Sequence, residues 1–130
     1  MYELVKTFPF EAGHTLEAHD GACRMPHGHS YTMAITIRGE SITPSGPKEN
    51  MLIDFHDIGS IVKPMVETYL DHKWLNDTLQ TKAPTAEYIA KWVFDYLQSK
   101  LPGLFRVSIS ETATSTASWE ASGRPFLERK

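Results

Sequence analysis

The residues best suited to chemistry lie near the start of the chain, where His14, Cys23, His27 and His29 fall within one short stretch. In an extended backbone, side chains two positions apart point the same way, so His27 and His29 face one side. Imidazole is the commonest metal-binding side chain at neutral pH. If a strand that ends at His14 pairs with one that begins near His29, three imidazoles meet. Three protein ligands with a fourth position left open are typical of a catalytic zinc site.

Three further features could serve such a site. The lone Cys23 has two interpretations. It is either a small buried residue or, beside a metal and imidazoles, a reactive thiolate, because nearby positive charge lowers the pKa of a thiol. Such a thiolate could be a general base, a nucleophile or a fourth metal ligand. Asp71 next to His72 can fix the imidazole tautomer; the alternative is an Asp at a helix end beside an exposed His. Glu111 ends an apolar strand face, where a carboxylate could accept two N–H groups of a pterin or guanine ring. The alternative is an ordinary surface Glu.

Hydrophobic periodicity predicts the elements that must position these residues. Strands are expected over 2–14, 29–38, 51–53, 104–111 and 117–121, and helices over about 54–70 and 85–100. Pro64 should bend or split the first helix, and Thr85 is a plausible N-cap of the second. Helices grouped between strand pairs predict one α+β domain over residues 1–130, with an antiparallel sheet and the helices on one face. Self-association would then cover the other face and the edges.

Composition excludes several classes of protein. Thirteen Lys and Arg against sixteen Asp and Glu give a net charge of −3, and no basic block offers a nucleic-acid surface. No apolar run approaches the roughly 20 residues that span a bilayer. The first residues have no export signal, and a single cysteine fits a reducing compartment. We therefore expect a cytoplasmic protein without nucleic-acid or membrane partners.

Five motifs, in order, resemble the 6-pyruvoyltetrahydropterin synthase family. They are Phe10-Glu11-Ala12-Gly13-His14, Cys23-Arg24-Met25-Pro26-His27-Gly28-His29, Asp71-His72-Lys73-Trp74-Leu75-Asn76, Pro84-Thr85-Ala86-Glu87 and Glu111-Thr112. The resemblance implies the tunnelling fold, an antiparallel four-stranded sheet with two helices on one face that assembles into a barrel by oligomerisation. It also implies a homotrimer or homohexamer with active sites at subunit interfaces.

The resemblance further implies a role for each site residue. His14, His27 and His29 would bind Zn²⁺, Cys23 would be a catalytic thiolate, and Asp71 with His72 would be the second acid–base element. Glu111 would anchor the pterin ring, in a pocket lined by Thr85 and Glu87. The residues that hold the substrate's triphosphate stay open among Arg24, Lys48, Lys73 and Lys82.

The short gap between Cys23 and His27 is similar to the branch of the family that forms 6-carboxy-5,6,7,8-tetrahydropterin in queuosine biosynthesis. That branch converts 7,8-dihydroneopterin triphosphate into the carboxytetrahydropterin, acetaldehyde and triphosphate. Ala86, Tyr88 and Trp119 depart from the family pattern and put only details of the pocket in doubt. Two alternatives stay open: a pyruvoyl-forming synthase for biopterin or folate, and a non-catalytic domain in which Cys23 closes a structural zinc site.

Overall fold

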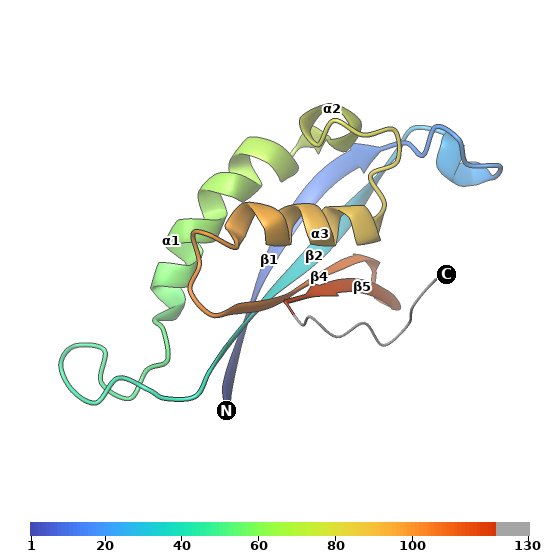
Figure 1. Ribbon diagram of the computed structural model, residues 1–130. Coiled ribbons are helices and arrows are strands. Elements are labelled where there is room, and N and C mark those ends of the chain that lie inside the picture. Colours follow the sequence, from blue (N-terminus) through green and yellow to red (C-terminus); the bar gives the residue numbers. More distant parts are fainter. Residues whose placement is uncertain (122–130) are drawn as a thin grey trace.

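Five strands form one sheet in the computed structural model, which describes residues 1–121. They are β1 (Tyr2–His14), β2 (His27–Gly39), β3 (Lys73–Trp74), β4 (Leu104–Thr112) and β5 (Ser115–Glu120), in the order β3-β1-β2-β4-β5 (Figure 1). The predicted four-stranded antiparallel sheet is confirmed in β1, β2, β4 and β5. The sequence did not predict β3, which is two residues long and pairs in parallel with β1.

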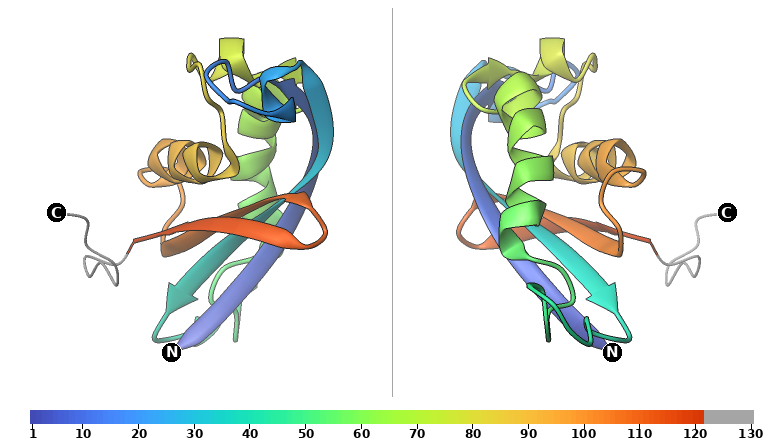
Figure 2. Two further views of the ribbon diagram at one scale, coloured as in Figure 1. Left: turned by 90° about the vertical axis from the view of Figure 1, so that its right-hand side faces the viewer. Right: turned by 90° about the vertical axis from the view of Figure 1, so that its left-hand side faces the viewer.

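Two main helices cover one face of this sheet, α1 (Phe55–Met65) and α3 (Ala86–Leu97) (Figure 2). Both were predicted, and the Thr85 hydroxyl caps α3 by accepting a hydrogen bond from the Tyr88 N–H at 3.1 Å. The predicted split near Pro64 is also confirmed, because α1 gives way at Val66–Leu70 to a π-helix, η2. A short helix α2 (Leu75–Thr78) and a 3-10 turn η1 (Ala22–Arg24) complete the helical elements of the described residues.

The core lies between the helices and the apolar face of the sheet. Side chains at period two along β1 and β2 are buried, as their alternation predicted: Phe8, Phe10, Ala12, His14, Tyr31, Met33, Ile35 and Ile37. All of these except His14 pack in one cluster with apolar residues of the helices, among them Ile58, Val62, Ile89, Val93 and Leu97. The opposite face of β4 and β5 carries hydroxyl groups instead, with 2.7 Å contacts from Ser108 to Ser118 and from Ser110 to Thr116. The sheet therefore has one apolar and one polar face.

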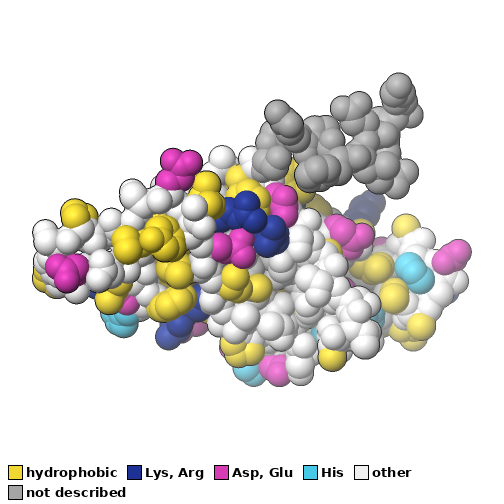
Figure 3. All heavy atoms as spheres, turned by 90° about the horizontal axis from the view of Figure 1, so that it is seen from below, with side chains coloured by type: hydrophobic (Ala, Val, Ile, Leu, Met, Phe, Trp, Pro, Cys, Tyr) yellow, Lys and Arg dark blue, Asp and Glu magenta, His cyan; other side chains and the backbone are white. Residues whose placement is uncertain are grey.

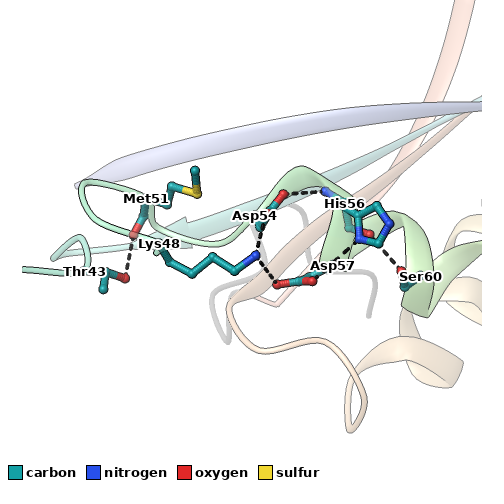
Figure 4. Close-up of polar contacts among 7 residues, drawn as sticks. All are labelled: Thr43, Lys48, Met51, Asp54, His56, Asp57 and Ser60. Carbon is teal, nitrogen blue, oxygen red and sulfur yellow. Dashed lines mark hydrogen bonds and ion pairs between the residues drawn. The ribbon is translucent and has the colours of Figure 1, made fainter. Parts of the chain in front are cut away.

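The expected strand over residues 51–53 is wrong. The backbone there closes a loop on itself, because the N–H and hydroxyl of Thr43 donate to the Met51 carbonyl and the Asn50 N–H donates to the Thr43 carbonyl. Lys48 then ties this loop to the start of α1, with its ammonium 2.5 Å from Asp54 and 3.6 Å from Asp57 (Figure 4). Both backbone groups of Met51 are used inside the loop, since its N–H donates to the Lys48 carbonyl, and the segment does not add to the sheet.

Charged side chains are interspersed on the underside of the molecule, where Lys and Arg lie beside Asp and Glu (Figure 3). Two ion pairs link neighbouring strands, Arg38 to Glu3 at 2.8 Å and Arg106 to Glu120 at 2.7 Å. Both guanidinium groups also lie over the Phe105 ring. Among the described residues, no helix is long and apolar enough to cross a membrane.

Gly103, in the turn from α3 to β4, offers a test of the fold. Its φ is +77°, and an added Cβ would lie 2.9 Å from the Arg38 carbonyl oxygen. The two segments cannot easily move apart, because the Arg38 N–H donates a hydrogen bond to the Gly103 carbonyl. We expect Gly103→Ala to lower the free energy of unfolding by about 1–3 kcal/mol. Denaturant titration measures the change. Gly46→Ala is the matched control, since its φ is +96° but its Cβ would meet nothing within 4 Å; an equal loss in both variants would contradict the close contact at Gly103.

Candidate metal centre

Strand pairing brings the three histidines of the N-terminal region together. In the β1–β2 register His14 lies opposite His27 and Ala12 lies opposite His29. All three imidazoles therefore occupy the face of the sheet that also carries Phe10 and Tyr31, at the end of the core. One ring nitrogen of each histidine lies within 4.8 Å of the others, so this group could hold a metal ion.

Backbone carbonyls fix the tautomers of two of these imidazoles. Nδ1 of His14 lies 2.8 Å from the Pro84 carbonyl oxygen, and Nδ1 of His27 lies 2.7 Å from that of Met25. A carbonyl oxygen only accepts, so each Nδ1 carries the proton and, in the neutral ring, each Nε2 carries a lone pair. Burial lowers the pKa of His14, which keeps it neutral near pH 7.

The unprotonated nitrogens point at one place. The Nε2 atoms of His14 and His27 are 2.9 Å apart, and two lone pairs that face each other repel unless a cation or a proton lies between them. Nε2 of His29 is buried and has no hydrogen-bond partner among the described residues. Three imidazole ligands at zinc distances of about 2.0–2.1 Å would be spaced by roughly 3.3 Å in a tetrahedral site. The donor set and its spacing fit a divalent transition metal of the zinc type.

Tyr31 forms the floor beneath this group, a place that sequence reasoning assigned only to the core. It is 1% exposed, its ring stacks on Phe10 at 4.7 Å, and its hydroxyl lies 3.4 Å from Nδ1 of His14. Burial, with a smaller contribution from Glu111, raises the pKa of Tyr31, so the phenol stays protonated. The sequence feature that could have placed Tyr31 at the site is its spacing, because Tyr31 continues the period-two series of His27 and His29 along β2.

The predicted pair of Asp71 and His72 is formed where η2 ends. The Asp71 carboxylate accepts the Glu11 N–H at 2.9 Å and lies 3.0 Å from Nδ1 of His72. The Glu11 N–H, followed by His72, lowers the pKa of Asp71. His72 adopts φ +58° and donates its N–H to the Glu11 carbonyl. The pair is thus anchored to β1 on both sides of Glu11, with the imidazole exposed.

Several of the predicted site residues line two open grooves. One, of about 680 Å³, is lined by His27, His29, His72 and Lys73 together with neighbouring residues of β1 and β2. The other, of about 590 Å³, is lined by Thr85, Glu87 and Glu111 and by residues of β5. Glu111 connects the two, since its Oε2 lies 3.6 Å from Nε2 of His29.

Cys23 lies on η1, in the loop between β1 and β2, and is half-buried. Its carbonyl accepts the Leu16 N–H at 2.9 Å. The thiol does not belong to the group of three histidines that could hold a metal, so the structure does not favour it as a fourth ligand. Its catalytic role stays a prediction. Of the candidate phosphate-binding residues, Lys73 lines a groove whereas Lys48 is paired with Asp54.

Comparison with known proteins agrees with this architecture. The family model described as 6-pyruvoyl tetrahydropterin synthase matches residues 3–122. The chain is 39% identical to a 6-carboxy-5,6,7,8-tetrahydropterin synthase of Synechocystis, covering 90% of this chain and 92% of the relative. It is 32% identical to the enzyme of that name from Haemophilus influenzae, covering 92% and 99%. The solved 6-pyruvoyl tetrahydropterin synthase of Caenorhabditis elegans superposes with a TM-score of 0.78 at 25% identity, covering 93% and 96%.

These comparisons confirm the fold that the motifs implied, the T-fold of the solved synthases, while the assembly into a barrel stays a prediction. The match runs over nearly all of the described chain, and it includes every segment that contributes to the two grooves and the three histidines. The chain belongs to the 6-pyruvoyl tetrahydropterin synthase family.

Proposed function

We propose that this chain is a zinc-dependent 6-carboxytetrahydropterin synthase of queuosine biosynthesis. It would convert 7,8-dihydroneopterin triphosphate and one water molecule into 6-carboxy-5,6,7,8-tetrahydropterin, acetaldehyde and triphosphate. The observation that carries the proposal is the convergence of three imidazoles, one with an unpartnered buried nitrogen, beside a carboxylate at the mouth of a groove. Relatives that bear this enzyme's name, and the short gap between Cys23 and His27, support this branch of the family.

The metal ligands in this proposal are Nε2 of His14, His27 and His29. Zinc, when bound, supplies a Lewis acid that polarises hydroxyl groups of the substrate's side chain. The Pro84 and Met25 carbonyls contribute by holding two rings in the tautomer that presents a lone pair. Such outer contacts orient the ligands and raise their basicity.

The pterin ring in this proposal occupies the groove between the start of α3, the end of β4 and the start of β5. The Glu111 carboxylate accepts two adjacent N–H groups from the ring, and Thr85 and Glu87 line the wall. Since Glu111 also lies close to His29, a ring anchored there directs its substituent toward the three histidines. The groove, at about 590 Å³, is in the size range of small-ligand sites.

Proton transfer is assigned to Cys23 and to the pair of Asp71 and His72. The low pKa of Asp71 keeps its carboxylate charged, and this carboxylate holds Nδ1–H of His72, which leaves Nε2 to accept or return a proton. The Cys23 thiolate takes the other proton. The proposal includes a homotrimer or homohexamer in which neighbouring copies cover these open grooves and complete each site.

Product analysis tests the proposal. Purified protein of measured zinc content is incubated with 7,8-dihydroneopterin triphosphate, and the pterin products and acetaldehyde are quantified. Carboxytetrahydropterin with one equivalent of acetaldehyde is expected. A pyruvoyl product would assign the chain the activity named for the Caenorhabditis elegans protein. Full zinc occupancy without any turnover would indicate the non-catalytic domain.

Replacement of Glu111 by Gln tests the pterin anchor. An amide cannot accept two N–H groups as a carboxylate does, and hydrogen bonds to charged groups contribute about 1.5–3 kcal/mol. We therefore expect kcat/KM to fall by roughly 10- to 100-fold, mostly through KM, with zinc content unchanged. Glu40→Gln is the matched control, because Glu40 is exposed and lines neither groove. An unchanged KM in Glu111→Gln would indicate that Glu111 is an ordinary surface residue and not the pterin anchor.

A further inference from the structure

The segments that form the candidate site meet at one side chain without an assigned role, Asn76. It lies on α2 (Leu75–Thr78), which packs beside the C-terminal end of β1 (Figure 1). Five residues before it is Asp71, at the end of η2. Asn76 lines neither groove that holds the predicted catalytic and substrate-binding residues, so any effect it has on them acts through its neighbours.

The side-chain amide of Asn76 is hydrogen-bonded to Thr15, the residue that follows the candidate metal ligand His14. Its Oδ1 accepts the Thr15 N–H at 2.9 Å and its Nδ2 donates to the Thr15 carbonyl at 2.8 Å. Both backbone groups of Thr15 are thus bound by one planar side chain, across 61 residues of sequence. Of the side chains of this size, only an amide offers an acceptor and a donor side by side. Two bonds to one residue, one to each of the peptide units that flank its Cα, fix the orientation of the backbone there as well as its position.

Thr15 in turn holds the turn that carries Cys23. Its hydroxyl donates to the Arg24 carbonyl at 2.6 Å, and the next residue, Leu16, donates its N–H to the Cys23 carbonyl at 2.9 Å. The 3-10 turn η1 is therefore attached to the backbone just after His14. A displacement of Thr15 would move Cys23 relative to the three histidines.

The same amide reaches the segment before α3. Nδ2 of Asn76 also lies 3.4 Å from the Lys82 carbonyl, which accepts the Glu17 N–H at 3.1 Å. Two residues later, the Pro84 carbonyl binds Nδ1 of His14 at 2.8 Å. Asn76 therefore holds together the end of β1, the Cys23 turn and the segment that fixes the tautomer of His14.

We propose that Asn76 is a positioning residue that sets His14, the Cys23 turn and the Pro84 carbonyl relative to one another. The inference rests on the proposed function in that the three histidines bind zinc. Because Asn76 is fixed to Thr15 by two bonds, its loss frees the backbone on the C-terminal side of His14 and the attachment point of Cys23 together. A side chain that served only to stabilise α2 would leave both unaffected.

Two variants and two readouts test this role. Asn76→Ala removes all three contacts, and Asn76→Asp keeps the size and the acceptor but loses both donors. Zinc affinity is measured by competition with a chromophoric chelator, and we expect it to fall about 10- to 100-fold, as for the loss of other outer contacts of a metal site. The alkylation rate of the metal-free protein by iodoacetamide reports on Cys23 alone, because it is the single cysteine of the chain. We expect this rate to rise several-fold in both variants.

Thr78→Val is the matched control. Its hydroxyl donates to the Tyr69 carbonyl at 2.6 Å, so the variant also removes a side-chain bond of α2, but one that reaches none of the three segments. It should keep wild-type zinc affinity and wild-type alkylation. If Asn76→Ala does not fold, Asn76→Asp provides both readouts.

The outcomes separate this role from the proposed function. Lower thermal stability of the Asn76 variants with unchanged zinc affinity and unchanged alkylation would overturn the positioning role. If wild-type protein binds no zinc, the proposed function fails, and the alkylation rate alone then decides whether Asn76 holds the Cys23 turn.

Discussion

His29→Ala is expected to abolish zinc-dependent turnover while the metal-free protein keeps nearly all of its stability. Nε2 of His29 is buried without a hydrogen-bond partner among the described residues, so its removal breaks no such bond in the metal-free chain. Structural zinc sites with four ligands have apparent binding free energies of about 10–16 kcal/mol. One ligand's share is about 3 kcal/mol, which corresponds to more than ~100-fold in zinc affinity.

Replacement of other histidines makes this test more specific. His14→Ala should also destabilise the metal-free protein, because His14 is 1% exposed and its loss leaves the Pro84 carbonyl without its donor. His56→Ala is the control for histidine removal, since that side chain is 84% exposed. Thermal melts with and without added zinc measure both effects. Equal zinc-induced rises of Tm in His29→Ala and in wild-type protein would contradict the three-histidine site.

The metal group could be predicted because it depends on local rules. Period two along each strand fixes which side chains share a face, and the short connection from His14 to His27 favours an antiparallel hairpin. The observed pairing of His14 with His27 and the burial of the same face follow from these two rules. The placement of Glu111 near His29 also follows, because β4 continues the same alternation beside β2.

Other parts depend on contacts between segments far apart in the sequence. β3 is too short to have a period, and it exists because His72 and Lys73 bind the edge of β1. The segment 51–53 has strand-like residues, yet both backbone groups of Met51 are bound inside its own loop. The hydrogen bonds between Asn76 and Thr15 join residues 61 positions apart, and no local sequence pattern predicts them. Tertiary hydrogen bonding, rather than propensity, decides these positions.

Cys23→Ala should lower turnover by about 10²- to 10⁴-fold, the range that a positioned general acid or base contributes, with zinc content and fold unchanged. The reason is that Cys23 is proposed to take a proton, whereas the three histidines alone form the group that could hold the metal. Cys23 is half-buried on η1, a turn whose backbone carbonyls accept hydrogen bonds from the Leu16 N–H and the Thr15 hydroxyl, so the turn keeps these attachments without the thiol. Metal analysis, circular dichroism and steady-state kinetics on the same preparation measure the three quantities.

Cys23→Ser separates a base from a ligand. A serine hydroxyl is nearly the same size but ionises at far higher pH than a thiol, whose ordinary pKa is about 8.5, so the variant keeps the shape and loses the base. We expect it to be as inactive as Cys23→Ala and to bind zinc as tightly as wild-type protein. In a closed structural site, by contrast, thiolate is a bound ligand and its loss costs zinc affinity and stability together. Zinc loss in both variants, in step with a lower Tm, would therefore replace the catalytic assignment of Cys23 with a structural one.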